Sequence, residues 1–593
     1  MKITCLGGVK EIGGNKILVE HEGVRILFDF GRAMGRANCY YEEFIQVRSK
    51  SALLDLLKLG ILPKVDGVYP KHLLDITAMP KDEDIELESK LPLDDAYDYW
   101  KNDSIIPYGS DKKIDAVFLS HAHFDHIQDI SFIHKDIEIH STETTKILAK
   151  AITDVSQSSV EHQFYEVNDK KKISIKSENY RTVFPGELEY KDDKEVKLID
   201  DPKTGYTFTH ETKTVQRNYI TDGEGEVHGL RYKLIPVGHS IPGACSILIT
   251  TSDDKRIFYT GDIRFHGTNE PTLDDYINNI GENKIDVMIC EGTRIESDTE
   301  LTEEDVYRDI LDEAKKTKGL LLVDFGWKDT TRFDTFVRVA NDTGRTLVIN
   351  VKIAYLLYEL HLMNSDKYPD PREMKNVKVY KKRQGGLFYS KADYEKFKAG
   401  YLSHWGRNSA KIDQNIVRIS EKMGIGGESS PDVEEPSRID KNTWDLAINH
   451  IENGIPAYEI RKNPDKYILM FSFWDANELF DLSNPDGTIP NSKYIRASCE
   501  PFNDEMEIDE EKLMNWLDKF GVEYIIDDKN GKRFFKRAHV SGHACKPEIK
   551  KLIETIKPEI LIPIHTEKPE LFEEVAKGIS KVILPEYGKT YNF

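Results

Sequence analysis

The chain has 593 residues, which is too many for a single ordinary hydrophobic core, so we expect at least two domains. Hydrophobic residues make up 39% of the chain and charged residues 31%, and these values exclude a disordered or fibrous protein. The formal net charge of −21 argues against a general binder of polyanions, unless basic residues gather locally.

The N-terminus meets Lys10 and Glu11 too early for a signal peptide, and no apolar run approaches the ~20 residues of a membrane span. The six cysteines stand far apart and form no Cys-x-x-Cys pair. This spacing argues against a disulfide framework and against a cysteine-based zinc finger. We therefore expect a cytoplasmic protein that makes no contact with a membrane.

Three strands separated by glycine turns are predicted at the start of the chain, over 2–6, 16–20 and 25–28. The pattern changes over 32–113, where a short apolar helix at 51–59 is followed by a charged stretch. We interpret 32–113 as an insertion. A second insertion, over about 168–229, is rich in charge and is expected to form solvated loops or hairpins.

Short β-rich runs then lead into polar residues of metal-ligand or acid type: His121, His239, Asp262 and Glu291. From 303 to about 398, helical and strand patterns alternate, which predicts a separate α/β unit with a parallel sheet. Near the C-terminus we expect a strand over 534–540, a helix, and a strand over 560–564. Such a βαβ crossover would place His543 and His565 at the carboxyl ends of parallel strands in one sheet.

Residues 121–126 carry the sharpest chemical signal, with His121, His123, Asp125 and His126 directly after a strand. Alternate side chains of a regular strand point to opposite faces, so the chain must turn after His123 for all four to converge. Converged imidazoles and carboxylates are typical of sites for divalent ions such as Zn²⁺. A His-rich solvated loop is the alternative interpretation.

This His-x-His-x-Asp-His pattern resembles the metallo-β-lactamase superfamily, and further motifs follow in the order of that family. The resemblance implies that Asp29 is a structural carboxylate, that His239 is the next metal ligand and that Asp262 bridges two ions. Three positions resemble the extra motifs of the β-CASP branch, which includes ribonuclease J-like nucleases: Glu291, His543 and His565.

The resemblance implies an α/β fold, in which a metallo-β-lactamase αββα sandwich carries an inserted β-CASP-like α/β domain. The first part of the sandwich would span 1–300, the inserted domain 301–533, and the completion of the sandwich 534–593. Two features depart from the family. Gln128 and Asp129 stand where Gly-Gly is usual, and the chain ends soon after His565, which argues against assembly of the ribonuclease J type.

Coordination chemistry and the resemblance together imply two divalent ions, with Zn²⁺ expected and Mn²⁺ as the alternative. One ion is assigned to His121, His123 and His239, the other to Asp125, His126 and His565, and Asp262 to both. A hydroxide held between two such ions would attack phosphorus in line with the leaving oxygen.

Four more residues are assigned around the ions. His543 is the candidate acid for the leaving oxygen, and Glu291 would orient it. The alternatives are a helix-capping His543 and a purely structural Glu291. Ser541 and Gly542 are expected to bind phosphate near a helix N-terminus.

One stretch of the chain is strongly basic, although the net charge of the whole chain is negative. Residues 371–411 hold eleven basic and three acidic residues, with aromatic residues between them. Cations that follow phosphates and aromatic rings that stack on bases are typical of single-strand binding, so Lys381, Lys382 and Arg383 are candidate RNA contacts. An amphipathic surface helix is the alternative.

The function predicted first is a metal-dependent phosphodiesterase, most specifically a ribonuclease that hydrolyses single-stranded RNA. A DNA nuclease of the same branch, a metallo-hydrolase of small esters or thioesters, and a catalytically silent scaffold are the competing interpretations. The expected partner is single-stranded RNA, and a homodimer is left open.

Overall fold

The computed structural model describes most of the chain. Its description leaves out 43, 50, 75–103, 110–111, 157–158, 176–179, 184–186, 191–207, 269, 282, 299–300, 384–388, 391, 396–452, 502 and 530–531. Within 169–213, the structure describes the backbone of the strands alone.

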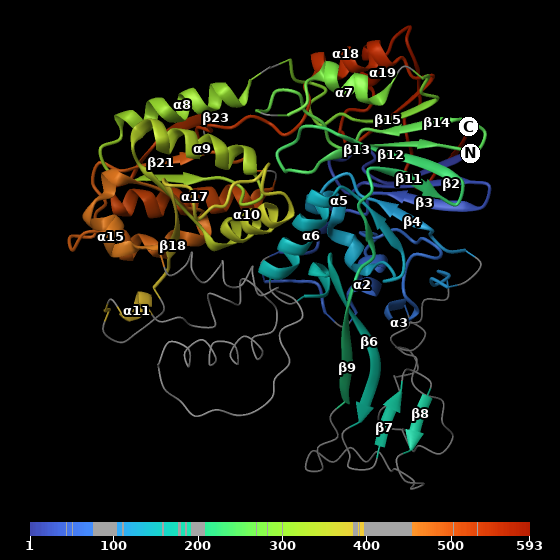
Figure 1. Cartoon of the computed structure of the whole chain (residues 1–593), viewed down its shortest axis with the longest axis horizontal. Coiled ribbons are helices and arrows are strands. Elements are labelled where there is room, and N and C mark those ends of the chain that lie inside the picture. Colours follow the sequence, from blue (N-terminus) through green and yellow to red (C-terminus); the bar gives the residue numbers. More distant parts are fainter. Residues whose placement is uncertain are drawn as a thin grey trace.

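The first of three large sheets has the strand order β10-β5-β4-β3-β2-β1-β27. Its strands are β1 (Lys2–Gly7), β2 (Lys16–His21), β3 (Val24–Phe28), β4 (Ala116–Phe118), β5 (Glu138–His140), β10 (Tyr219–Ile220) and β27 (Thr590–Asn592). Because β27 pairs antiparallel with β1, the two ends of the chain lie side by side (Figure 1).

The second sheet has the order β11-β12-β13-β14-β15-β25-β26. Its strands are β11 (Glu224–Val227), β12 (Leu230–Pro236), β13 (Cys245–Thr250), β14 (Arg256–Tyr259), β15 (Val287–Glu291), β25 (Ile560–Ile564) and β26 (Lys581–Val582). The neighbours β14, β15 and β25 run parallel, so their carboxyl ends meet at one edge.

These two sheets form a sandwich with helices on both outer faces (Figure 1). Apolar side chains of both sheets fill the space between them, including Val19, Phe28, Ile249 and Ile289. α7 (Leu273–Ile280), α18 (Lys546–Ile556) and α19 (Leu571–Val575) cover the second sheet, and α2 (Ala52–Lys58) and α6 (Glu143–Val155) cover the first. The predicted αββα sandwich is thereby confirmed.

The third sheet is parallel and has the order β19-β18-β17-β20-β16-β21-β22. Its strands are β16 (Leu321–Asp324), β17 (Thr346–Ile349), β18 (Val377–Lys381), β19 (Ile455–Pro456), β20 (Tyr467–Met470), β21 (Lys493–Arg496) and β22 (Glu523–Tyr524). The predicted alternation of helices and strands after residue 303 is present within a few residues at each end.

Helices cover both faces of the third sheet. α8 (Glu303–Lys316), α9 (Thr330–Thr343) and α10 (Val351–Met363) pack with Leu321 and Val323 on one face. α15 (Ala457–Lys462), α16 (Leu479–Leu482) and α17 (Asp504–Phe520) pack with Leu320 and Leu322 on the other. The division into 1–300, 301–533 and 534–593 remains our proposal for the domains.

The third sheet and its helices, from α8 to β22, are called the third-sheet unit. This unit is joined to the sandwich through α6 and α10, which lie side by side (Figure 1). Lys150 on α6 donates to Glu359 on α10 at 2.6 Å and lies 3.4 Å from Asp154. Tyr355 donates to Asp154 at 2.6 Å. This buried polar cluster is surrounded by one continuous apolar core, so the two units are firmly packed together.

The inserted stretches contribute elements of two kinds. In 32–113, α1 (Met34–Ala37), α2 and α3 (Lys71–Leu74) are described, and the leucines of α2 are buried in the core of the sandwich. In the second stretch, β6 (Glu166–Ile175) pairs with β9 (Phe208–Gln216), and β7 (Tyr180–Val183) pairs with β8 (Glu187–Tyr190). These antiparallel pairs extend away from the sandwich, as the prediction of hairpins implied (Figure 1).

The predicted strand over 534–540 is wrong. β24 (Lys532–Phe535) pairs only with β23 (Ile526–Lys529), and the chain beyond it runs without a regular element to α18. The neighbours of β25 are β15 and β26, so the predicted βαβ crossover is not formed. His543 therefore lies in a connecting loop, whereas His565 follows a strand end.

Shorter elements complete the described fold: α5 (Phe124–Ile127), α11 (Ala392–Glu395), and the 3₁₀ helices η1 (Gln128–Phe132), η2 (Val160–His162), η3 (Pro464–Lys466) and η4 (Phe473–Glu478). Among the described residues, none of the helices combines the length and the apolar character that crossing a bilayer requires. All six cysteines are free, and four of them are buried.

Candidate metal centre

The sharp turn predicted in 121–126 is present. β4 leads directly into Ser120 and His121, and His123 is still extended, with φ −73° and ψ 150°. α5 begins at the next residue and carries Asp125 and His126 in its single turn. The change from extended backbone at His123 to helix at Phe124 brings the side chains of this motif to the same side.

The other side chains come from the edge where the parallel strands of the second sheet end. Asp262 follows β14, Glu291 is the last residue of β15, and His565 follows β25. Glu291 is paired with Ile564, which places it beside His565. His239 follows β12 and enters from the neighbouring antiparallel part of the sheet.

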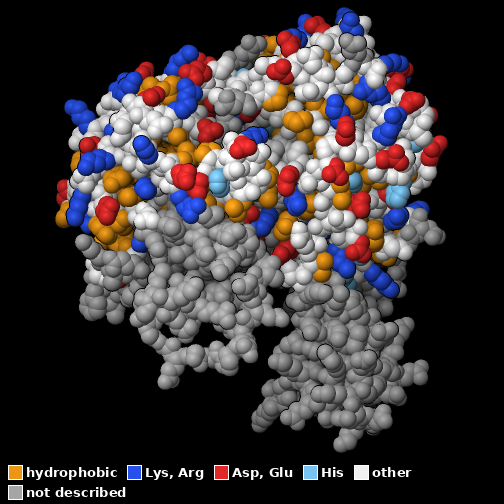
Figure 2. Space-filling model, viewed as in Figure 1, with side chains coloured by type: hydrophobic (Ala, Val, Ile, Leu, Met, Phe, Trp, Pro, Cys, Tyr) orange, Lys and Arg blue, Asp and Glu red, His pale blue; other side chains and the backbone are white. Residues whose placement is uncertain are grey.

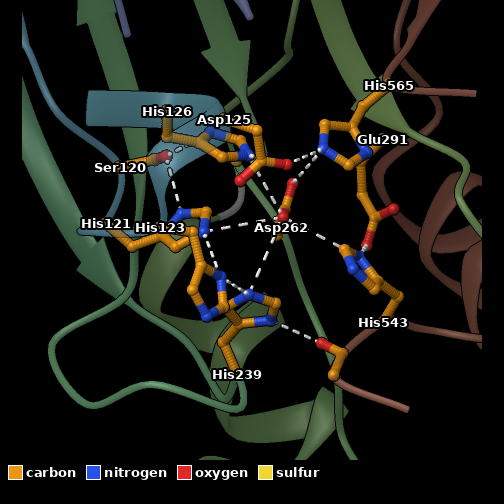
Figure 3. A network of polar contacts seen from close by, with 12 residues as sticks. Ser120, His121, His123, Asp125, His126, His239, Asp262, Glu291, His543 and His565 are labelled. Carbon is orange, nitrogen blue, oxygen red and sulfur yellow. Dashed lines mark hydrogen bonds and ion pairs between the residues drawn. The ribbon is translucent and has the colours of Figure 1, made fainter. Parts of the chain in front are cut away.

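The structure brings all seven predicted ligands together, with Asp262 in the middle (Figure 3). Within each of two groups, the possible ligand atoms lie within 4.8 Å of one another. The first group is His121, His123, His239 and Asp262, and the second is Asp125, His126, Asp262 and His565. Asp262 belongs to both groups, as a bridging carboxylate would.

Short distances between like atoms distinguish this cluster from an ordinary polar core. The Nδ1 atom of His123 lies 3.0 Å from the Nε2 atoms of both His121 and His239. Three imidazole nitrogens that face one another need a shared proton or cation. On the other side, His565 Nε2 lies 3.1 Å from an oxygen of Asp125.

The donor set fits divalent metal ions, because buried polar atoms are left without hydrogen-bond partners. Both carboxylate oxygens of Asp262 and the Nε2 atom of His126 are in this state within the described residues. Asp262 is 1% exposed and His126 is fully buried. Buried polar atoms without partners are rare in native proteins, so each requires an explanation such as a bound ion.

The charges in the cluster have the distribution that a cation requires. Burial lowers the pKa of His123 to about 3 and holds the pKa values of His121 and His239 well below their usual range. Burial alone would raise the pKa of Asp262, but the neighbouring histidines, with His126 first, hold it well below its usual value. Neutral imidazoles at His121, His123 and His239 beside an ionised Asp262 are the protonation states that bind divalent ions. At His126, burial opposes a charge, but the surrounding carboxylates, with Asp262 first, raise the pKa well above its usual value, so they favour a positive charge at that position.

A second layer of contacts orients the ligands from behind. Asp29 accepts hydrogen bonds from Ser120 N at 2.7 Å and from the Tyr259 hydroxyl at 2.7 Å, and it lies 2.8 Å from His126 Nδ1. Thr293 Oγ1 lies 2.8 Å from His565 Nδ1. Partners of this kind fix the ring orientation and tautomer of a metal-binding histidine.

The sequence analysis anticipated Asp29 but missed Ser120, Tyr259 and Thr293. Each of the three lies within three residues of a motif residue, and that proximity was the available signal.

Glu291 and His543 form a pair at the side of the cluster (Figure 3). His543 Nδ1 lies 3.2 Å from Glu291 Oε1 and 3.8 Å from Asp262 Oδ2. Burial opposes a charge on His543, but Glu291 and Asp262 outweigh it and raise its pKa to about 9. The His543 side chain is 19% exposed, whereas that of Glu291 is fully buried, so His543 is the member of this pair that solvent or substrate can reach.

The expected phosphate site at Ser541 and Gly542 lacks the free helix N-terminus on which it was based. α18 begins only at Lys546, and Glu548 already accepts the hydrogen bond of the Cys545 amide. The Gly542 carbonyl instead faces His239 Nδ1 and orients that ring. A Cβ at Gly542 would lie 2.7 Å from Ser240 Oγ and 3.0 Å from the His239 ring, so a larger residue here would have to displace both side chains.

The candidate RNA contacts Lys381, Lys382 and Arg383 lie at the end of β18, away from the cluster residues in the fold. Lys382 pairs with Asp475 at 2.8 Å, and Arg383 pairs with Asp481 at 3.1 Å. Two of the three cations are thus locally compensated. Much of the remaining basic stretch, including 396–411, lies outside the described residues.

The unusual Asp129 is explained by buried ion pairs. It lies 3.0 Å from Lys16 Nζ and 2.6 Å from Arg32 Nε, and all three side chains are nearly inaccessible to solvent. Arg32 also pairs with Glu161 at 2.9 Å. This departure from the family pattern is therefore matched by two cations that neutralise it.

One further residue near the cluster comes from the third-sheet unit. Lys328, in the loop between β16 and α9, donates to the Ala122 carbonyl at 3.4 Å and lies 4.3 Å from the Phe124 ring centre. Burial lowers its pKa to about 8. The sequence analysis did not identify it, because the sequence gives no sign that this loop reaches residues 121–126.

Comparisons with known proteins agree with this geometry. A family model described as the RNA specificity domain of Zn-dependent metallo-hydrolases matches residues 534–581, which include His543 and His565. "Ribonuclease J" of Pyrococcus abyssi is 24% identical over 365 residues, which span 59% of this chain and 58% of that protein. "Probable RNase MJ4" of Methanocaldococcus jannaschii is 26% identical over 185 residues, which span 31% of this chain and 34% of that protein.

The chain thus spans less than two thirds of the length of these curated relatives. A crystal structure of a protein of unknown function from Enterococcus faecalis V583 aligns over 100% of this chain and 99% of that chain, with a TM-score of 0.56 and 18% identity. That likeness concerns the fold alone.

The sandwich, the parallel-sheet unit and the histidine–carboxylate cluster together are the fold and site that the resemblance to the metallo-β-lactamase superfamily implied. Within that class, the sequence matches confirm the resemblance to the β-CASP branch that the motifs around Glu291, His543 and His565 had indicated.

Proposed function

We propose that the chain is a metal-dependent phosphodiesterase that hydrolyses single-stranded RNA. The observation that carries this proposal is the coincidence of two features at the same residues. The segment that matches an RNA specificity domain contains His543 and His565, and both lie in the buried cluster around Asp262.

The proposed metal content is two divalent ions, most consistent with Zn²⁺, with Mn²⁺ as the alternative. His121, His123 and His239 would hold one ion, and Asp125, His126 and His565 the other, with Asp262 shared. Such ions supply Lewis-acid activation of the phosphodiester and lower the pKa of water towards ~7.

The proposed role of His543 is to give a proton to the leaving oxygen of the RNA. Its position supports this role, since it lies beside the cluster and is partly exposed to solvent. Its Nδ1 atom faces the Glu291 carboxylate at 3.2 Å, which leaves Nε2 for the substrate. Glu291 is itself fixed, because it accepts hydrogen bonds from the amides of Ile263 at 3.2 Å and Thr293 at 3.0 Å. Glu291 is therefore proposed as a positioning residue.

The proposed phosphate contacts are revised by the geometry. Lys328 places an ammonium group at the edge of residues 121–126, where a phosphate bound to the cluster would meet it. A second, weaker contact with the RNA phosphates is proposed at Lys381, Lys382 and Arg383. It is weaker because aspartates already neutralise Lys382 and Arg383. Two further candidate phosphate contacts, Ser541 and Gly542, are retained because they directly precede His543. The His543 amide donates a hydrogen bond to Ser541 Oγ at 3.2 Å.

Single-stranded RNA as the partner and a cytoplasmic location remain predictions of the same proposal, and a homodimer is left open. Its test is a substrate panel, in which metal-loaded protein is incubated with labelled single-stranded RNA, single-stranded DNA and small esters and thioesters. We expect cleavage of RNA, and its loss in Asp262→Asn. Cleavage of DNA at an equal rate would favour the general nuclease, and hydrolysis of the small esters alone would contradict the proposal.

A further inference from the structure

A cavity of about 600 Å³ lies at the carboxyl edge of the third sheet. Residues at or just after the ends of five parallel strands line it: Asp324, Asn350, Lys382, Met470 and Arg496. None of the seven candidate metal ligands lines this cavity. It is therefore a separate feature from the cluster around Asp262.

The topology of the sheet explains why a cavity opens there. From β16 the chain continues to β17 on one side, and from the neighbouring β20 it continues to β21 on the other. Right-handed crossovers in opposite directions put the following helices on opposite faces, as α9 and α16 show. The loops after β16 and β20 therefore diverge, and open α/β sheets bind ligands at such points.

The floor of the cavity holds buried polar atoms without partners. Among the described residues, Glu510 Oε2, Ser498 Oγ and Arg496 Nε have no hydrogen bond, although all three residues line the cavity. The Glu510 side chain is 3% exposed, and its other oxygen, Oε1, is paired with Arg537, so only Oε2 is left for a ligand. Leaving a buried carboxylate oxygen without a donor is costly, so these atoms indicate a polar ligand that donates hydrogen bonds to Glu510.

The walls add aromatic rings and Lys352, a cation that the nearby Asp475 attracts without forming an ion pair with it. Phe473 and Trp474 line the cavity with their rings in contact, and Trp474 is 72% exposed. Lys352 makes no hydrogen bond or ion pair within the described part of the chain, whereas its neighbour Lys382 is held by Asp475. Exposed aromatic rings stack on bases, and a free ammonium group binds phosphate.

We propose that this cavity binds a nucleotide, with the base against Trp474 and Phe473, the phosphate at Lys352, and hydroxyl or amino groups at Glu510. The choice of a nucleotide as ligand rests on the proposed function, since RNA supplies all three groups in one unit.

The cavity is connected to the metal centre by a single loop. Trp327 lines the cavity, and the next residue, Lys328, donates to the Ala122 carbonyl between His121 and His123. Neighbouring Cα atoms are ~3.8 Å apart, so this loop places one wall of the cavity one residue from a contact with residues 121–126. The ligand is thus either a nucleotide of the RNA chain or a free mononucleotide of the same chemistry.

The test compares Lys352→Met and Trp474→Ala with the metal-loaded wild type. Titration calorimetry measures the Kd of adenosine 5′-monophosphate, and cleavage kinetics measure KM and kcat for a single-stranded RNA octamer. Lys466→Met is the matched control, because Lys466 is an exposed lysine at the amino end of β20, on the opposite edge of the same sheet. Thermal unfolding and metal content show that each variant is folded.

We expect both variants to raise the Kd of the mononucleotide about tenfold and the control to leave it unchanged. A parallel rise in KM for RNA, with kcat within about twofold, would identify the ligand as a nucleotide of the RNA chain. An effect on the mononucleotide alone would identify a free nucleotide. A wild type that does not bind the mononucleotide, or two variants with the wild-type Kd, would overturn the proposal even if the protein cleaves RNA.

Discussion

His543 is the residue whose role separates chemistry from metal binding. It lies beside Glu291 and Asp262 but outside the two groups assigned to the ions. His543→Ala should leave the metal content and folding intact and lower turnover on RNA by ~10²–10⁴, the usual contribution of a positioned acid. Turnover is measured beside metal content by elemental analysis.

The control for this prediction is a phosphodiester with a nitrophenolate leaving group, which departs without a proton. The loss on that substrate should be much smaller than the loss on RNA. If both substrates lose activity equally, His543 supports the site or binds phosphate. A loss of metal would instead make it a ligand, in agreement with its proximity to Asp262 and His565.

Asp129 provides a test of stability at the residue scale. Its carboxylate neutralises Lys16 and Arg32 in a region with almost no solvent access. Asp129→Asn keeps the shape but leaves Lys16 buried without a counter-charge, so the free energy of unfolding should fall by about 3–5 kcal/mol. Urea unfolding followed by fluorescence measures the change.

The matched control is Asp136→Asn, a change of the same kind at a carboxylate that is 60% exposed. Its effect should stay within about 0.5 kcal/mol. Equal effects of the two substitutions would mean that the buried ion pairs contribute no more than a surface contact does.

At the scale of elements, the helix pair α6–α10 carries a pH-dependent contact between the sandwich and the third-sheet unit. Lys150 lies between Asp154 and Glu359, and burial raises the pKa of Asp154 to about 6. Lys150→Met removes the one cation that pairs with both carboxylates among the described residues, so we expect a loss of about 3 kcal/mol in unfolding free energy at pH 8. Lys146→Met, one turn earlier on α6, is the control.

The loss should be smaller at pH 5. Because the pKa of Asp154 is raised in the folded state, protonation of Asp154 stabilises the folded protein. As the pH falls below about 6, Asp154 becomes neutral and no longer repels the Glu359 carboxylate, so the loss of Lys150 costs less. Chemical unfolding of both variants at pH 5 and pH 8 measures this difference. An equal loss at both pH values would contradict the assignment of Asp154 as the titrating group.

The sequence predicts the elements best where the pattern is local. The strands before His121 and Asp262 and the helices after residue 303 follow from short periodicities and turn residues. The error over 534–540 has a physical cause. Phe535 packs in one core and Val540 in another, so the apolar run is a connection between two cores rather than a strand. Sequence periodicity does not distinguish these cases.

The metal cluster was predictable because its ligands follow strand ends in a recognisable order. The role of the basic stretch stays a prediction, and the pairing of two of its cations could not be predicted because their partners are far away in the sequence. Asp475 and Asp481 pair with Lys382 and Arg383 across more than 90 residues. Lys328 was missed for the same reason, since a tertiary contact places it near residues 121–126.

At the scale of the whole molecule, the acidic net charge has to be reconciled with a polyanionic substrate. Figure 2 shows basic and acidic side chains intermixed on the face it displays, over the described residues. Long-range attraction of RNA by a uniformly basic surface is therefore not the expected mode of binding. Binding would instead depend on a few local contacts, such as the metal ions, Lys328 and the cavity at the third sheet.

The most direct test of the central claim is RNA cleavage during metal titration of chelated protein. Labelled single-stranded RNA is the substrate, and bound Zn²⁺ or Mn²⁺ is counted by elemental analysis in the same samples. We predict no cleavage without metal, and activity that saturates at about two ions per chain, since one carboxylate is shared by two groups of ligands. Full cleavage by the metal-free protein, or saturation of binding at one ion with no loss of metal in His565→Ala, would contradict the account.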